Sequence, residues 1–301
     1  MAGRQRKPID EQVVVIVGAS SGLGRAAAEA FAHAGAQLLI TARDGAALED
    51  LAAELRTTGT RVEWLAMDTG DYAQVQATGA RASELFGRVD TWVQVAGIGV
   101  YSTVADLRPE DLRRVIETDL YGPAYGAMVA LPLLRERGGG LIVVSSIESE
   151  VGLPFQGAYA AAKHGVRGLL DVLRMELEHE GVPVSVTNIK PATINTPFFS
   201  NVATRLGVRP RGVPPVYAPE RVAAAIVRAA RAPRAEVVVG GAGLAMIWSK
   251  RLMPRLTDRL IGHFAYEAQL TDRATSPADP GNRDTPSGDT RVRADALTGA
   301  D

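Results

Sequence analysis

The chain has no cysteine among its 301 residues, and it has only four histidines. Disulfides, thiol nucleophiles and cysteine-based zinc sites are therefore excluded, and a reducing compartment such as the cytoplasm is the simplest setting. The histidines form no HxxxH or HxH pair. Because paired histidines are the usual ligands of a cysteine-free zinc site, the sequence predicts no metal.

A large net charge and a long apolar run are also missing. The formal net charge is −1, so we expect no general attraction to nucleic acid or to acidic membranes. No apolar run reaches the roughly 20 residues of a transmembrane helix, and the first one, at 13–17, is too short for a signal-peptide core. Hydrophobic residues still make up 46% of the chain, enough for one domain with a large core.

Short apolar runs alternate with helical patterns along most of the chain. Strands are expected at 13–17, 37–41, 61–66, 91–95, 140–145, 184–189 and 236–239, and helices at 23–34, 45–57, 71–86, 109–136, 156–181 and 219–231. This alternation predicts one parallel, seven-stranded sheet, doubly wound with helices on both faces, which is an α/β fold. Ligands of such a sheet bind at the carboxyl ends of the strands.

A glycine-rich turn follows the first expected strand. Five β-branched residues at 13–17 are typical of a strand buried on both faces, and Gly18, Gly22 and Gly24 come directly after them. Good helix formers then begin at residue 25. A strand, a glycine turn and a helix together present free backbone N–H groups to a phosphate, whereas the absence of a lysine after the last glycine disfavours a P-loop. An ordinary βα turn is the alternative.

A hydroxyl, a phenol and an ammonium stand at a fixed spacing later in the chain. Tyr159 follows Ser146 by thirteen positions, and Lys163 follows Tyr159 by four. On a helix Tyr159 and Lys163 share a face, and a neighbouring ammonium lowers the pKa of a phenol. Such a phenol exchanges a proton with an alcohol or carbonyl oxygen, which Ser146 is placed to hold. Alone, this pattern would be a chance surface arrangement.

Together the glycine turn and the Ser–Tyr–Lys spacing resemble the short-chain dehydrogenase/reductase family, from about residue 13 to about residue 239. The resemblance implies a Rossmann-type fold and an oxidoreductase that interconverts an alcohol and a carbonyl with Ser146, Tyr159 and Lys163. The cofactor contacts that it implies are Gly18, Ser20, Ser21, Gly22, Leu23, Gly24, Arg43, Asp68, Ala96, Gly97, Tyr159, Lys163, Pro191, Ala192, Ile194 and Thr196.

Asp119 is the largest departure from the family pattern. It stands where the family has the asparagine that completes a catalytic tetrad, so we include it among the catalytic residues. An ionised carboxylate accepts hydrogen bonds but donates none. Asp119 is therefore expected either to pair with Lys163 or to hold a kink in its helix.

Smaller departures occur at the other motifs. Gln94 and Val95 replace two asparagines that brace the central sheet in relatives, so we expect altered bracing with the cofactor site retained. Val17 replaces a threonine before the glycine turn, and Ala192 replaces a glycine in the segment beside the nicotinamide.

The end of the second strand predicts the choice of cofactor. Relatives that prefer NAD carry an acid for the ribose 2′-hydroxyl at the position of Ala42. Arg43 follows instead, and its planar guanidinium suits a 2′-phosphate. We therefore expect NADP, with NAD still possible because Asp44 is placed either to reach the ribose or to neutralise Arg43.

The substrate side is expected to be mostly apolar. Residues 193–218 form a loop-rich segment that is placed to close over a ligand. The predicted wall consists of Val100, Tyr101, Ile147, Phe155, Phe198 and Phe199. Glu148 is the expected polar contact for specificity, or else it faces solvent.

The segments on either side of the domain are expected to differ in how well ordered they are. We predict a flexible N-terminus at 1–12, a Rossmann-type domain at 13–243, an amphipathic helical extension at 244–270, and a polar tail at 271–301 that is disordered or extended. Residues 244–262 have helical apolar spacing with basic residues between, interrupted at Pro254. This stretch packs on the domain or a partner subunit, or contacts a membrane.

Two alternatives remain beside an NADP-dependent oxidoreductase of a largely apolar small molecule. One is a catalytically weak dinucleotide-binding sensor or scaffold, which the changes at Gln94, Val95 and Asp119 favour. The other is a peripheral-membrane reductase of lipid-like substrates. The family resemblance also implies a homodimer or homotetramer, formed through the helices expected at 109–136 and 156–181.

Overall fold

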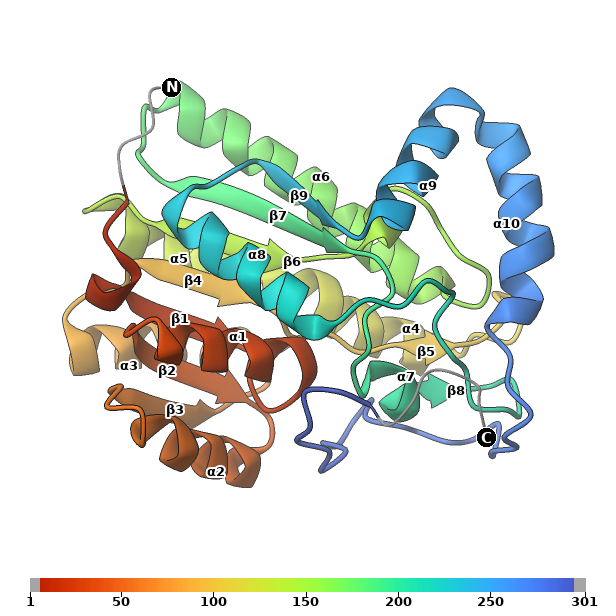
Figure 1. The fold of residues 1–301 in the computed structure, drawn as a ribbon, viewed down its shortest axis with the longest axis horizontal. Helices are drawn as coiled ribbons and strands as arrows, with labels where there is room; N and C mark the ends of the chain where they lie inside the picture. Colours follow the sequence, from red (N-terminus) through yellow and green to blue (C-terminus); the bar gives the residue numbers. More distant parts are fainter. Residues whose placement is uncertain (1–5, 295–301) are drawn as a thin grey trace.

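The structure, a computed structural model, describes residues 6–294 and is built on a parallel sheet (Figure 1). Its strands are β1 (Val13–Val17), β2 (Gln37–Ala42), β3 (Val62–Ala66), β4 (Thr91–Gln94), β6 (Gly140–Val144), β7 (Ser185–Pro191) and β9 (Glu236–Val239). They lie in the order β3-β2-β1-β4-β6-β7-β9, with every pair parallel. The predicted doubly wound seven-stranded sheet is confirmed.

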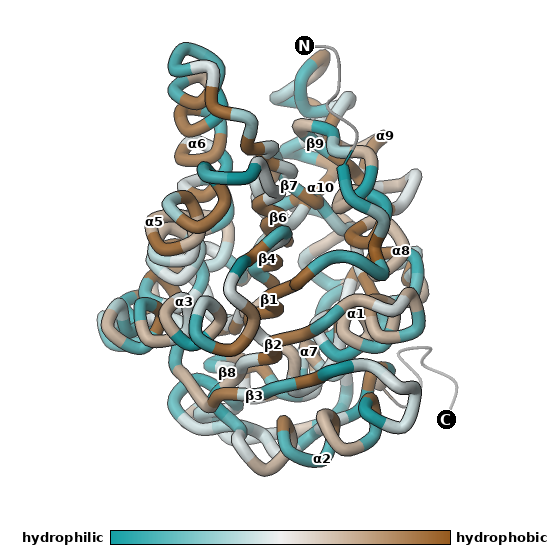
Figure 2. Tube along the Cα trace, turned by 90° about the vertical axis from the view of Figure 1, so that its left-hand side faces the viewer, coloured by the Kyte–Doolittle hydropathy of each residue, from teal (hydrophilic) through white to brown (hydrophobic). Residues whose placement is uncertain are grey.

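Helices cover both faces of this sheet, as the brown strands between two helical layers show in Figure 2. The helices of the domain are α1 (Gly22–His33), α2 (Gly45–Arg56), α3 (Tyr72–Phe86), α4 (Pro109–Ile116), α5 (Gly122–Arg135), α6 (Gly157–His179) and α8 (Pro219–Arg231). Val14 and Ile16 of β1 pack into the layer of α1, α2 and α8, whereas Val15 and Val17 pack into that of α3, α5 and α6. The period-two alternation of a strand therefore fills two cores from one β-branched run.

The helix expected at 109–136 is not continuous, which corrects the prediction. A π-helical turn at Glu117–Tyr121 separates α4 from α5. Pro123 lacks the N–H that would bond the carbonyl of Asp119, so the α-helical ladder is interrupted at this point. The N–H of Gly122 instead reaches the carbonyl of Glu117, five residues back.

Several short elements at the carboxyl ends of the strands were not predicted. Strands β5 (Val100–Tyr101) and β8 (Ala203–Thr204) form a separate two-stranded sheet, and α7 (Phe198–Asn201) contributes residues to the pocket described below. Ile147–Ser149 forms one 3₁₀ turn. Elements of two to four residues carry no periodicity that sequence reasoning could detect.

Beyond the sheet, two helices and an extended segment complete the chain. Helix α9 (Gly241–Leu252) ends before Pro254, which begins α10 (Pro254–Ala268). Residues 271–294 contain no helix and run from α10 past α7 toward β2, as the dark-blue ribbon of Figure 1 shows. No helix within residues 6–294 is both long and apolar enough to cross a bilayer.

The two ends of the chain are described in part. Of the expected flexible N-terminus, residues 1–5 lie outside the described range, while Ile9 of a 3₁₀ turn at Ile9–Glu11 and Gln12 are buried. Of the expected polar tail, residues 295–301 also lie outside it.

Candidate active site

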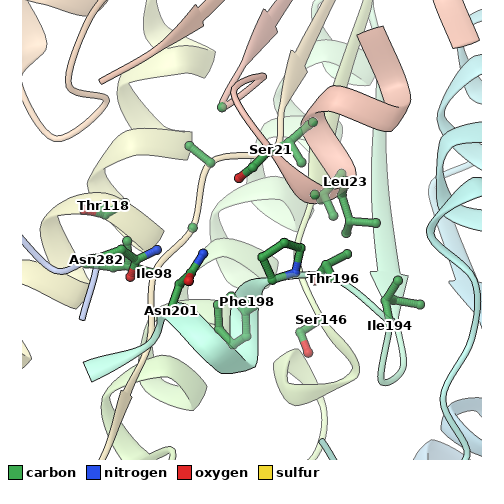
Figure 3. Close-up of a pocket in the computed structure, with 18 of the residues that line it drawn as sticks. Ser21, Leu23, Ile98, Thr118, Ser146, Ile194, Thr196, Phe198, Asn201 and Asn282 are labelled. Carbon is green, nitrogen blue, oxygen red and sulfur yellow. The ribbon is translucent and has the colours of Figure 1, made fainter. Parts of the chain in front are cut away.

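A pocket lies at the carboxyl ends of the strands, and it runs from the glycine turn to α6. Figure 3 shows Ser21 and Leu23 at one side of it and Ser146 at the other. Every residue expected to contact the cofactor lines this pocket, and so does Ser146. Asp119 alone among the predicted site residues lies behind the wall, fully buried.

The glycine turn is shaped by close backbone approaches. A Cβ on Gly24 would lie 1.8 Å from the carbonyl oxygen of Gly18, and a Cβ on Gly18 would lie 2.5 Å from the backbone nitrogen of Ala96. Gly18 also has a φ of +93°, which favours glycine. These contacts bring the N-terminus of α1 against the end of β1, where its backbone N–H groups suit a phosphate. The turn therefore fits the pyrophosphate of a dinucleotide.

The opposite wall of the cofactor end comes from the residues that follow β2 and β3. Arg43 follows β2, and Asp68 follows β3, where its side chain pairs with Arg114 and accepts the N–H of Gly70 at 2.9 Å. Arg43 donates hydrogen bonds to two backbone carbonyls of the 271–294 segment, which lines this end of the pocket. The sequence contained no periodicity that would have placed this segment here.

Gln94 braces the sheet differently from the asparagines of the family. Its side-chain nitrogen donates to the hydroxyl of Thr69 at 2.8 Å, and its side-chain oxygen accepts from the indole of Trp92 at 3.4 Å. The longer amide thus connects β4 to the loop after β3. Ala96 and Gly97 remain in the pocket wall, in line with the expectation of altered bracing and a retained site.

Tyr159 and Lys163 lie one turn apart on α6, on the face that meets the pocket. The ammonium of Lys163 is 5.1 Å from the centroid of the Tyr159 ring. Ser146 follows β6, has an extended backbone and caps the 3₁₀ turn at Ile147–Ser149. Its hydroxyl accepts the N–H of Glu148 at 3.1 Å. The pocket therefore brings together the hydroxyl, phenol and ammonium that the spacing predicts.

Asp119 pairs with Lys163, which is one of the two roles that the sequence left open, and it also contacts the loop after β4. One carboxylate oxygen accepts the N–H of Ile98 at 2.8 Å, and the other lies 3.3 Å from the ammonium of Lys163. Its position on the π turn directs it toward the loop after β4. Burial raises the pKa of Asp119, and the Lys163 ammonium acts in the opposite direction.

The pKa of Tyr159 is raised well above its ordinary value, which corrects the expectation that Lys163 lowers it. Burial is the largest cause, followed by the negative charges of Asp119 and Glu148, while a hydrogen bond with Ser146 lowers the pKa. The charge of Lys163 is balanced by Asp119, so little of it remains to stabilise a phenolate. The phenol consequently keeps its proton at neutral pH.

A family model described as short chain dehydrogenase matches residues 12–206. The chain belongs to this family. The relative YxnA from Bacillus subtilis, named an uncharacterized oxidoreductase, is 37% identical over 278 residues, which cover 91% of this chain and 78% of YxnA.

Two solved structures are similar to this short-chain dehydrogenase. An alcohol dehydrogenase from the archaeon Thermococcus sibiricus, in complex with 5-hydroxy-NADP, has a TM-score of 0.68 and 27% identity, covering 76% of this chain and 95% of its own. A short chain dehydrogenase/reductase from Burkholderia phymatum, in complex with NAD, has a TM-score of 0.75 and 25% identity, covering 89% and 99%. The chain is an NAD(P)-dependent dehydrogenase/reductase by this membership.

The substrate end of the short-chain dehydrogenase differs in part from the predicted wall. Most of the predicted residues do line the pocket, namely Ile147, Glu148 and the aromatic residues Tyr101, Phe198 and Phe199. Val100 is buried beneath it, and Phe155 packs its ring 4.3 Å from that of Tyr266 on α10, so neither forms the wall.

Several further wall residues were missed, two of them at the substrate end. Leu153 and Gln156 line the pocket from the loop between Ser146 and Tyr159. Their position between two catalytic residues is the only signal that could have indicated them.

Replacing Asp119 with asparagine should lower the pKa of Tyr159, because it removes a buried negative charge near the phenol. Asparagine keeps an oxygen for the N–H of Ile98. Alcohol oxidation needs the phenolate as base, so its kcat/KM rises with pH, and this rising limb should move to lower pH in the variant. Parallel pH profiles of wild type and Asp119→Asn check the shift; a limb that stays in place or moves to higher pH contradicts it.

Proposed function

We propose that this short-chain dehydrogenase reduces a carbonyl on a largely apolar small molecule, with NADP as its cofactor and Tyr159 as the acid. The observation that supports this most is one continuous pocket with a phosphate-binding turn at one end and Ser146, Tyr159 and Lys163 at the other. When bound, the nicotinamide supplies or accepts the hydride.

The protein's own groups position the substrate and move its proton. Ser146 holds the substrate oxygen with its hydroxyl, and Tyr159 donates a proton to that oxygen as negative charge develops on it. Because the raised pKa keeps the phenol protonated at neutral pH, Tyr159 is in the form that acts as the acid in carbonyl reduction. Asp119 holds Lys163 in place. The family resemblance implies that Lys163 also contacts the ribose of the nicotinamide.

The cofactor preference rests on the end of β2. Ala42 offers no acid to a ribose 2′-hydroxyl, and Arg43 lines the pocket next to it. Asp44 is engaged as the N-cap of α2, where it accepts the N–H of Ala47 at 3.1 Å. This contact holds Asp44 on α2, which supports NADP over NAD.

Arg43→Ala should raise the KM for NADPH by about ten- to a hundredfold, because it removes charge-assisted hydrogen bonds to the 2′-phosphate. The KM for NADH should change less than threefold, since NADH lacks that phosphate. Steady-state kinetics with both cofactors measure the two effects. Arg137→Ala is the matched control, because Arg137 lies before the start of β6 and the pocket lies at the carboxyl ends of the strands. Equal changes for NADPH and NADH would exclude the assignment.

Tyr159→Phe should lower NADPH-dependent carbonyl reduction by about 10²- to 10⁴-fold, because it removes the proton donor but keeps the ring. Oxidation of NADPH with a panel of ketones and aldehydes measures it, with Tyr121→Phe, an exposed tyrosine, as the control. Wild-type rates in Tyr159→Phe would refute the acid role. If NADPH fluorescence shows binding but none of the carbonyls supports NADPH oxidation, the protein is the dinucleotide-binding sensor instead.

We also propose that the protein is a cytoplasmic homodimer or homotetramer. The exposed faces of α5 and α6 carry large apolar side chains, which favour burial in an interface. These residues are Tyr121 at the start of α5, Met128, Leu169, Val172 and Met175.

Met175→Glu should shift the oligomer toward monomer, because it adds a charge to this apolar face. Sedimentation velocity across a concentration series measures the shift. Leu256→Glu on α10, where the leucine is also exposed, is the control. Dissociation by Leu256→Glu alone would place the interface on α9 and α10 instead.

A further inference from the structure

Two buried polar side chains at the substrate end have oxygens that lack a hydrogen-bond partner among the described residues. They are the phenol of Tyr101 and one carboxyl oxygen of Glu148. Tyr101 is 1% exposed and Glu148 4%, and both line the pocket. An unpaired buried polar group costs about 1–3 kcal/mol, so such groups are usually completed by something that binds.

The surroundings of Glu148 hold it at a fixed place relative to the reacting centre. Its backbone N–H is bound to the hydroxyl of Ser146, two residues earlier on the same 3₁₀ turn. Tyr101 approaches from β5. Burial raises the pKa of the Tyr101 phenol, and the side chain of Gln156, which lies beside Tyr101, lowers it by less. The side-chain nitrogen of Gln156 donates to Gln269 after α10.

The charge state of Glu148 suits a neutral ligand. Burial raises the pKa of Glu148 to about 8, and a backbone hydrogen bond with Leu153, followed by the charge of the Lys163 ammonium, offsets this only in part. The other titratable groups near Glu148 are the phenols of Tyr101 and Tyr159. At neutral pH the carboxyl therefore carries a proton and both donates and accepts hydrogen bonds, as a hydroxyl group does.

We propose that Glu148 and Tyr101 together bind a second hydroxyl group on the substrate. This rests on the proposed carbonyl reduction and names its substrate class: ketones that carry a hydroxyl group away from the reacting carbon. The apolar residues that line the same pocket, among them Ile147, Leu153 and Phe198, then contact the hydrocarbon skeleton of the substrate.

Matched ketone pairs test the proposal. In each pair one cyclic, aliphatic or aromatic ketone carries a hydroxyl where the other carries a methyl group, such as 4-hydroxy- and 4-methylcyclohexanone. Wild type should prefer the hydroxylated member of at least one pair by about ten- to a hundredfold in kcat/KM, because the methyl analogue leaves buried polar groups unpaired. Glu148→Leu should bring this ratio to about one while turnover of the methyl ketone is kept, and Glu148→Gln should retain most of it.

The outcomes distinguish a failure of the proposed role of Glu148 from a failure of the proposed carbonyl reduction. Equal efficiency on all pairs in wild type, or an equal loss on both members in Glu148→Leu, overturns the role of Glu148 and leaves carbonyl reduction standing. No NADPH oxidation with any ketone overturns the proposed function itself.

A second, independent observation concerns residues 282–291, hereafter the strap. The guanidinium of Arg43 donates to the carbonyls of Asn282 at 2.6 Å and Arg283 at 2.9 Å, and the N–H of Gly22 donates to the carbonyl of Arg291 at 2.9 Å. These are donors that the proposed function assigns to the phosphates of NADP. Asn282 also lines the pocket, and its side chain is drawn in Figure 3.

The strap is anchored by buried contacts. Arg283 pairs with Asp111, which is fully buried on α4 and also accepts two hydrogen bonds from Arg205, at 2.7 and 2.8 Å. The N–H of Asn282 donates to the carbonyl of Asn201 at the end of α7, at 2.7 Å. The strap is therefore joined to the predicted lid at 193–218.

We infer that the strap is an autoinhibitory segment that NADP displaces from the adenosine end of the pocket. A donor used by a carbonyl oxygen is not free for a phosphate oxygen. Residues 286–289 of the strap also line the pocket, where Asp289 pairs with Arg291 at 2.9 Å, so the strap occupies space at the adenosine end. This inference rests on the proposed NADP binding.

Arg283→Ala in the full-length chain tests it, because it removes the anchor to Asp111 without touching the glycine turn. NADPH fluorescence should show faster association and an affinity about five- to a hundredfold higher, the usual range of coupling between two sites. A chain that ends at Pro280 should show the same or a larger gain, with folding checked by thermal melting. Weaker or unchanged binding in both variants overturns the inference, whereas no NADPH binding by any of the three proteins overturns the cofactor assignment.

Discussion

The buried ion pair between Asp119 and Lys163 is the contact on which the geometry of the site depends. Both side chains are almost fully sealed from solvent, and each charge offsets part of the several kcal/mol that desolvating the other costs. Asp119 also accepts the N–H of Ile98, so one carboxylate joins α6, the π turn and the loop after β4. Lys163 is thereby held one helical turn from Tyr159.

Burial, rather than the neighbouring ammonium, sets the acid–base character of the pocket. It is the largest cause of the raised pKa of Tyr159, Tyr101 and Glu148 alike. Because Asp119 balances Lys163, each of these acids keeps its proton near neutral pH. A pocket of protonated acids donates hydrogen bonds and a proton to oxygen, which suits a carbonyl that gains negative charge as it is reduced.

The two ends of the pocket are governed by different contacts. The substrate end combines residues near each other in the sequence, from Ser146 to Tyr159, with Tyr101, Phe198 and Phe199 from other elements. At the cofactor end, Arg43 meets carbonyls that lie 239 and 240 positions further along the chain. Control of cofactor entry in this short-chain dehydrogenase can therefore change without altering the groups that perform the chemistry.

The sequence by itself determined the sheet, the glycine turn and the Ser146–Tyr159–Lys163 group, because each depends on local periodicity or on a fixed spacing along one strand or helix. Only the tertiary structure decided the π turn that directs Asp119, the burial that raises the pKa of Tyr159 and Glu148, and the path of the strap over Arg43. Those features arise from contacts between distant segments, and desolvation depends on what surrounds a side chain in space rather than on its neighbours in the chain.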